Sequence, residues 1–332
     1  MAPLTGIYVP NLIPYDEQSR INEGELRRII SWLIENGVHG LYPNGSTGEF
    51  IRLSFEERLR VVEIIASETR GRVPILAGAA EANIDLVLQA CKRYADLGCR
   101  AVSLTGPYYF KVSQDSIEHY FREIARQSPV DILVYNIPQF ANEISLPVLN
   151  RLAQDCPRII GTKDSSRDFP RFVNTLHQIK SQRPDFVVFT GTEEILLPSL
   201  MMGADGGTIA TAGVVPEAIL AIYNDFQSGN IANAKRIQFE LLEVIGIMLT
   251  TGNFPDGFRA AAALRGFNFG KPRQTVSPRE AESIALVRTK LACLLAASGV
   301  SEAATVCAAG GVQRTTVDSI VREVMRTLGT VK

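Results

Sequence analysis

Lys163 is the residue of this chain whose type and position point most directly to chemistry. It ends the apolar segment Arg158–Asp164, whose pattern predicts a buried parallel strand. An amine carried into an apolar interior loses the hydration of its ammonium form, so the neutral form is favoured near neutral pH. A neutral amine attacks a ketone and forms a Schiff base. A strand-end lysine whose amine reaches water is nevertheless the commoner arrangement, so Lys163 alone does not establish this chemistry.

A second motif, Gly45-Ser46-Thr47-Gly48-Glu49, directly follows another strand-like segment. Its first four residues offer unobstructed backbone amides and two hydroxyls, a set of donors that suits a carboxylate. A tight strand-to-helix turn rich in small residues, with no binding function, would have the same sequence. The lysine that a phosphate-binding Walker loop requires after its last glycine is missing. We expect Glu49 to have a structural role, pairing or capping near the next turn.

Tyrosines at two further strand ends could move protons. Tyr135 closes the run Ile132–Val134, and Pro138 then stops the strand, so the phenol should point into the space at the strand ends. Schiff-base chemistry needs proton transfers, which a phenol relayed through Ser46 and a second tyrosine can supply without a metal. Tyr108 and Tyr109 are the candidates for that second tyrosine. A buried tyrosine is more often a core residue, so proximity to Lys163 carries this prediction.

The composition indicates an ordinary soluble globular protein. The chain has 332 residues, of which 46% are hydrophobic and 21% are charged, and its formal net charge is −1. Charges of both signs are scattered along the sequence, so no charged surface is indicated that would bind nucleic acid or an anionic membrane. We expect neither partner. The start of the chain has no basic patch followed by an apolar stretch, and no apolar run approaches about 20 residues. We therefore expect a cytoplasmic protein.

The cysteines and histidines do not suggest a metal site. The five cysteines are Cys91, Cys99, Cys156, Cys293 and Cys307, and none form a Cys-x-x-Cys pair. We expect reduced thiols that mostly pack in the interior of an intracellular protein. The three histidines are isolated from one another and from any cysteine cluster. A transition-metal centre and a histidine-based hydrolase triad are both disfavoured.

Residues 1–228 repeat one unit, a short β-branched run followed by a turn and an amphipathic segment. Eight such units in one series favour a closed (β/α)8 barrel, an α/β fold that collects chemistry at the carboxyl ends of its strands. Ser54 and Asn83 are expected to cap two of the helices. The eight strand-like runs are Gly6–Ile13, Val38–Tyr42, Val73–Ala77, Ala101–Leu104, Asp131–Tyr135, Ile159–Lys163, Phe186–Phe189 and Gly206–Ala210.

Helical patterns without strands come after the barrel. Residues 229–298 are expected to form a three-helix layer, with helices near Ile231–Leu249, Asp256–Arg265 and Pro278–Ala297. Residues 299–332 are expected to be a small-residue linker and an amphipathic tail helix over Val317–Leu328. That helix either docks on its own protein or inserts into a groove of a partner.

Taken together, these motifs resemble the class I pyruvate-dependent aldolases, whose members include N-acetylneuraminate lyase and dihydrodipicolinate synthase. The resemblance covers roughly residues 3–297 and implies a (β/α)8 barrel, usually a homotetramer. The motifs that carry it are Gly45–Glu49, Pro107-Tyr108-Tyr109, Tyr135–Pro138, Gly161–Asp164 and Gly203–Gly207, in that order.

The resemblance also implies roles for single residues. Lys163 would form the Schiff base with pyruvate, with no other cofactor and no metal, and Tyr135 would shuttle protons. Ser46 and Thr47 would hold the pyruvate carboxylate, and Tyr109 would be contributed by a neighbouring subunit. The further residues implied in substrate binding are Gly48, Tyr42, Ser165, Gly191, Glu193, Glu194 and Ile209, the last through its backbone carbonyl.

The substrate is narrowed by departures from the family patterns. Dihydrodipicolinate synthases carry an arginine just after the tyrosine motif, where this chain reads Gln139-Phe140, so that condensation is disfavoured. Neuraminate lyases share Tyr42, but they have aspartate at the position of Glu193 and serine at that of Ala210. The favoured reaction is cleavage of a 2-keto-3-deoxy sugar acid, or a related 4-hydroxy-2-oxo acid, to pyruvate and an aldehyde, or the reverse.

Three alternatives stay open. A sugar-acid dehydratase would use the same Schiff base, and a condensing synthase is disfavoured without being eliminated. A non-catalytic keto-acid binder or scaffold is opposed by the presence of Lys163, Tyr135 and Ser46 together. The tail resembles the encapsulation peptides of enzymes housed in bacterial microcompartments, which would make a shell its partner and a microcompartment its location.

Overall fold

The computed structural model describes residues 4–297 and 299–309, which form two compact units. The first holds residues 4–242 and 269–274, and the second holds the remainder. Helix α9 (Ile231–Thr250) runs from the first unit into the second. Among the described residues, no helix is long and apolar enough to cross a membrane.

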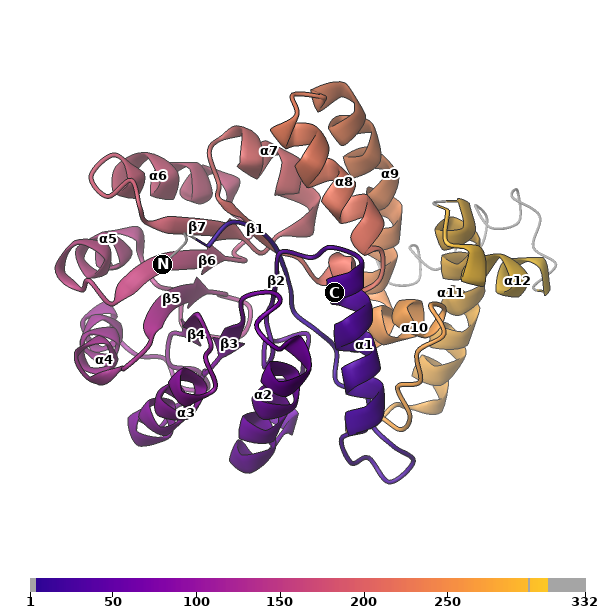
Figure 1. Ribbon diagram of the computed structural model, residues 1–332, viewed down its shortest axis with the longest axis horizontal. Coiled ribbons are helices and arrows are strands. Elements are labelled where there is room, and N and C mark those ends of the chain that lie inside the picture. The colour runs from indigo at the N-terminus through magenta and orange to yellow at the C-terminus, as the bar shows by residue number, and fades with distance from the viewer. Residues whose placement is uncertain (1–3, 298, 310–332) are drawn as a thin grey trace. The chain divides into compact units, whose positions relative to one another are not determined.

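The first unit is an eight-stranded parallel barrel. Its strands lie side by side in the order β2-β1-β8-β7-β6-β5-β4-β3, and a parallel bridge between Leu41 and Ile75 joins the two ends. Figure 1 shows the strands at the centre of this unit and its helices outside them. The predicted (β/α)8 fold is confirmed. The strands are β1 (Gly6–Val9), β2 (Gly40–Leu41), β3 (Leu76–Gly78), β4 (Ala101–Thr105), β5 (Asp131–Asn136), β6 (Ile159–Asp164), β7 (Val187–Thr190) and β8 (Gly206–Thr208).

The helices of this unit begin at the capping residues that the sequence indicated. Ser54 and Glu57 form a reciprocal capping box at α2, and the Asn83 side chain accepts from Asp85 N–H at α3. The helices are α1 (Glu23–Glu35), α2 (Phe55–Thr69), α3 (Ile84–Asp96), α4 (Gln114–Gln127), α5 (Leu146–Asp155), α6 (Phe169–Lys180), α7 (Leu196–Met201) and α8 (Pro216–Gln227), with short 3-10 turns η1 (Phe50–Arg52), η2 (Glu193–Ile195) and η3 (Ala210–Gly213).

The register of the strands decides which side chains fill the barrel. Tyr135 is paired with Lys163, and Lys163 with Phe189, so all three face the same side of the sheet. Phe189 belongs to a buried cluster that includes Tyr8 and Tyr42, which identifies that side as the interior. The side chains of this cluster are apolar or aromatic, and the Lys163 side chain lies on the same inward face.

The second unit is helical. It contains α10 (Asp256–Ala263), α11 (Pro278–Ala297) and α12 (Ser301–Ala309), together with the end of α9. Helix α12 corrects the expectation of a linker beginning at residue 299, because Val300 and Ala303 are buried and the segment has packed. The tail helix predicted for Val317–Leu328 lies outside the described residues.

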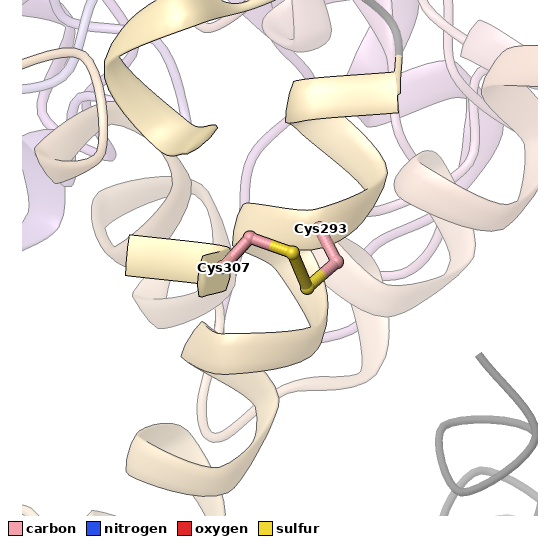
Figure 2. Close-up of a disulfide and its surroundings, with 2 residues drawn as sticks. All are labelled: Cys293 and Cys307. Carbon is pink, nitrogen blue, oxygen red and sulfur yellow. A yellow bond between two sulfur atoms is a disulfide. The ribbon is translucent and has the colours of Figure 1, made fainter. Parts of the chain in front are cut away.

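The expectation of five reduced thiols is wrong for two cysteines. Cys293 on α11 and Cys307 on α12 form a disulfide, with their Cα atoms 4.8 Å apart (Figure 2). The pair is separated by 14 residues and brought together by the turn between the two helices, which the cysteine spacing does not reveal. Cys91, Cys99 and Cys156 are free and buried, as expected.

Candidate active site

Lys163 stands at the centre of the carboxyl-terminal end of the barrel. Its side chain is buried, and its Nζ lies 4.0 Å from the centre of the Tyr135 ring and 4.5 Å from that of Tyr42. Within residues 4–297 and 299–309 it forms no ion pair. Burial lowers the pKa of the Lys163 amine, while Tyr135 and Glu193 act weakly in the opposite direction. This shift is toward the neutral, nucleophilic form that Schiff-base chemistry requires.

Both tyrosines beside Lys163 are held by hydroxyl partners. The Tyr42 hydroxyl donates to Ser103 Oγ at 3.1 Å, and Ser165 Oγ donates to the Tyr135 hydroxyl at 3.4 Å. Burial raises the pKa of Tyr42 far above its ordinary value, so this phenol stays neutral. Tyr135 thus connects the amine to Ser165, which gives protons a short path along the site.

Gly191 provides the space that Lys163 needs. A Cβ at this position would lie 2.7 Å from Lys163 Cε and 2.1 Å from Ser165 Oγ, so a side chain cannot be accommodated without displacing both. The residue is fixed by its N–H, which donates to the Asp164 carbonyl at 2.7 Å. The structure therefore brings Gly191 together with Lys163 and Ser165, as the sequence prediction implied.

The Gly45–Glu49 loop packs against the mouth of the barrel. Thr47 is buried and Ser46 half-buried, and a Cβ at Gly45 would lie 2.9 Å from Tyr42 Cε1. A Cβ at Gly48 would lie 3.1 Å from the Asn11 carbonyl oxygen. The two glycines allow the loop to lie close to the segments that directly follow β1 and β2.

Two residues with positive φ anchor this loop from its ends. Asn44 has a φ of 56°, and its amide donates to the Arg58 carbonyl and the Tyr94 hydroxyl. Glu49 has a φ of 53° and pairs with Arg52 at 2.7 Å. The structural role expected for Glu49 is confirmed.

Glu193 is a buried carboxyl close to the Lys163 site. Thr211 on η3 donates its backbone N–H to one Glu193 oxygen at 2.9 Å and its hydroxyl to the other. Burial raises the pKa of Glu193 to about 7, against the lowering effects of the Thr211 and Ala210 N–H groups and Lys163. Glu194 differs, because it is half-exposed and lies 3.5 Å from Arg167. The two glutamates therefore lie in different environments.

Tyr109 lies outside the group around Lys163 in its own chain. It is 91% exposed, has a φ of 75° and contacts Phe110, which is 73% exposed. Tyr108 takes a different direction and donates to Glu81 at 3.4 Å. Packing against the described part of the chain does not explain an exposed aromatic pair held in this backbone conformation.

Other residues of the site were not anticipated from the sequence. Asp164 accepts hydrogen bonds from Asn136 and Arg171 at 3.0 and 3.1 Å, and so braces the ends of β5 and β6. Ile209 is buried and donates its N–H to the Tyr8 carbonyl, but the register pairs Tyr8 with Thr208. Thr208 is therefore the β8 residue whose side chain faces the interior, a distinction that needs the strand register.

Comparisons with known proteins agree with this architecture. The family model of the dihydrodipicolinate synthetase family matches residues 3–293. An uncharacterized DapA-like lyase of Pyrococcus horikoshii is 34% identical over 264 residues, which cover 80% of this chain and 91% of the relative. A 4-hydroxy-tetrahydrodipicolinate synthase of Methanopyrus kandleri is 33% identical over 287 residues, covering 85% and 94%.

Two solved structures superpose well on this chain. The first is YagE of E. coli K12, a prophage protein of the dihydrodipicolinic acid synthase family in complex with pyruvate, with a TM-score of 0.81, 25% identity and coverage of 87% of this chain and 99% of YagE. The second is 2-keto 3-deoxygluconate aldolase from Picrophilus torridus, with a TM-score of 0.76, 29% identity and coverage of 82% and 99%. The chain belongs to the dihydrodipicolinate synthetase family and is a lyase of the aldolase kind.

The raised pKa of Glu193 predicts a pH dependence of stability. Because its folded-state pKa of about 7 exceeds that of an unfolded glutamate, the protein is expected to lose stability as pH rises from about 5 to about 7. Glu193→Gln should flatten this slope, recovering roughly 1–3 kcal/mol at pH 8. Melting temperatures measured between pH 5 and 8 give the pH dependence of stability, and Glu194→Gln serves as the control. Equal slopes in the wild type and Glu193→Gln would contradict the assignment.

Proposed function

We propose that this lyase is a Schiff-base aldolase that cleaves a 2-keto-3-deoxy sugar acid, or a related 4-hydroxy-2-oxo acid, to pyruvate and an aldehyde, or catalyses the reverse condensation. The observation that carries the proposal is the buried Lys163 amine between the rings of Tyr42 and Tyr135. YagE, which superposes on this chain, was solved with pyruvate, and another similar structure is an aldolase for 2-keto 3-deoxygluconate.

The residues suit each step of such a cleavage. The Lys163 amine adds to the C2 carbonyl, and the resulting carbinolamine loses water to give the iminium. The Tyr135 phenol, with its partner Ser165, carries the protons that this exchange requires. A base removes the C4 hydroxyl proton, and the C3–C4 bond breaks with its electrons moving into the iminium. The resulting enamine is protonated at C3 and hydrolysed to pyruvate and the free amine.

The substrate carboxylate is assigned to the Gly45–Gly48 loop. Ser46 and Thr47 offer hydroxyls there, and the glycines leave backbone N–H groups unobstructed. The rest of the substrate is assigned to the other residues around Lys163. The residues proposed for this role are Tyr42, Ser165, Gly191, Glu193, Glu194 and the Ile209 backbone.

The alternative reactions diverge only after the Schiff base has formed. Condensation on a second, carboxylate-bearing substrate is disfavoured because Gln139 donates to the Ser165 carbonyl and Phe140 is 57% exposed, where a clamping arginine would be needed. A sugar-acid dehydratase would use the same amine and phenol. A non-catalytic binder would have no need of an unpaired buried amine.

Release of pyruvate tests the proposal. We expect a panel of N-acetylneuraminate, 2-keto-3-deoxy sugar acids and 4-hydroxy-2-oxoglutarate to include a substrate, and borohydride with pyruvate to label the wild type covalently. Lys163→Ala should abolish both results, a loss of at least about 1,000-fold in turnover, whereas Lys92→Ala, at an exposed lysine, should change neither. Labelling without release would indicate a dehydratase or synthase. No labelling at all would refute Schiff-base chemistry.

We also propose that the protein is a homotetramer in which Tyr109 completes the proton relay of a neighbouring subunit. Its 91% exposure and its contact with Phe110 support this, as does the exposure of Ile51 and Phe140. These four side chains supply an apolar surface suited to a second copy of the chain.

Complementation between two inactive variants tests the shared site. Lys163→Ala and Tyr109→Ala are each expected to lose activity, because each removes one member of the relay. Mixed oligomers from co-expression should regain part of it, since a Lys163 subunit can receive Tyr109 from its neighbour. Activity of the mixture no higher than that of the separate variants would show that Tyr109 does not act between subunits. Co-expression of Lys163→Ala with itself is the control.

The tail is proposed as a docking peptide for a partner such as a microcompartment shell, on the strength of its apolar periodicity. Val317, Ile320, Val321, Val324 and Leu328 recur at helical spacing. Deleting residues 310–332 should leave pyruvate labelling and oligomer size unchanged while abolishing co-localisation with a shell. Loss of folding or of the oligomer on deletion would assign the tail to the protein's own assembly.

A further inference from the structure

Thr208 carries a buried hydroxyl that has no hydrogen-bond partner among the described residues. It is the last residue of β8, its side chain is 2% exposed, and its Oγ1 makes no contact with a donor or acceptor. Leaving a buried hydroxyl unpaired costs roughly 1–3 kcal/mol, so native proteins rarely do it without a reason.

The strand register aims this hydroxyl into the barrel. Thr208 pairs with Tyr8, whose ring belongs to the interior cluster and lies 5.2 Å from that of Phe189. A Cβ on Gly207 would lie 2.9 Å from Ile209 Cδ1, so the residues on either side of Thr208 share the opposite face. Thr208 therefore faces the interior.

The neighbouring strand places the hydroxyl at the level of the reacting amine. Thr190 of β7 pairs with Gly207, so the next residues along the two strands, Gly191 and Thr208, are neighbours. Gly191 is the residue whose missing side chain makes room for Lys163 Cε. The Thr208 hydroxyl thus lies on the same inward face as the Lys163 side chain, beside Gly191.

Several other hydroxyls near Lys163 already have partners. Tyr42 is bonded to Ser103, Tyr135 to Ser165, and Thr211 to Glu193. Buried hydroxyls without a partner elsewhere include Thr69 on α2 and Ser199 on α7, outside the barrel wall. The free hydroxyl of Thr208 is therefore available for a ligand in the Lys163 site.

We propose that Thr208 is a substrate-binding residue that donates a hydrogen bond to the carboxylate of the 2-oxo acid held at Lys163. The proposal rests on the function proposed above. Going round the barrel from Lys163 on β6 to β2, which precedes the Ser46 loop, β8 is the middle strand of the three between them. Tyr135 on β5 lies on the other side of Lys163. A carboxylate that extends from C2 toward Ser46 and Thr47 lies in the barrel interior that the Thr208 side chain faces.

Thr208→Val tests this because it removes the hydroxyl and keeps the shape. The half-saturating pyruvate concentration for borohydride labelling of Lys163 is expected to rise about 10-fold, the loss of one hydrogen bond to a charged group. Thr208→Ser should stay near the wild type. The melting temperature without ligand should be unchanged or higher in Thr208→Val, since an unpaired buried hydroxyl has become a methyl group.

The matched control is Thr69→Val, which removes an unpartnered buried hydroxyl away from the site and should not alter the half-saturating concentration. An unchanged half-saturating concentration in Thr208→Val would overturn the proposal and leave the aldolase function standing. If the wild type is not labelled at all, the aldolase function fails instead. The rise in melting temperature on adding pyruvate then tests Thr208 by itself, and an equal rise in the wild type and Thr208→Val would overturn its role.

Discussion

The structure of the site depends on one constraint, the burial of the Lys163 amine in an apolar barrel with no ion pair to a carboxylate of the described residues. A full ion pair would hold Lys163 charged, and exposure to water would do the same. The barrel instead surrounds Nζ with the faces of Tyr42 and Tyr135, which tolerate either protonation state. The nearest acidic influence is the Glu193 carboxyl, which burial itself keeps partly neutral at pH 7. The amine is therefore expected to be reactive because the fold keeps both an ion-pair partner and water away from it.

Parallel strand pairing fixes the positions of the residues that surround Lys163. The register sets Tyr135, Lys163 and Phe189 on one inward-facing row, and the polar groups then come from the separate segments after the strands. Asp164 holds the ends of β5 and β6 together through Asn136 and Arg171, so the row does not depend on the loops for its position. The strands therefore position the proposed Schiff-base lysine, and the loops carry the donors proposed for the substrate.

The sequence predicts well those features that depend on local pattern. The eight strands, the caps at Ser54 and Asn83 and the inward position of Lys163 and Tyr135 all derive from periodicity and strand ends. Features that need two distant segments were missed. The Cys293–Cys307 bond depends on the turn between two helices, and the inward face of Thr208 depends on the pairing with Tyr8. The hydrogen bonds between Glu193 and Thr211 likewise join η2 and η3, which no spacing rule connects.

The absence of a side chain at Gly191 restricts how such barrels can evolve. The place of its Cβ is filled by Lys163 Cε and Ser165 Oγ, so the position can gain a side chain only after the lysine has moved or gone. In a descendant that abandons covalent chemistry, this restriction disappears and larger residues become acceptable there. The identity of that one residue would then mark, in a lineage of related chains, the point at which the ancestral reaction was lost.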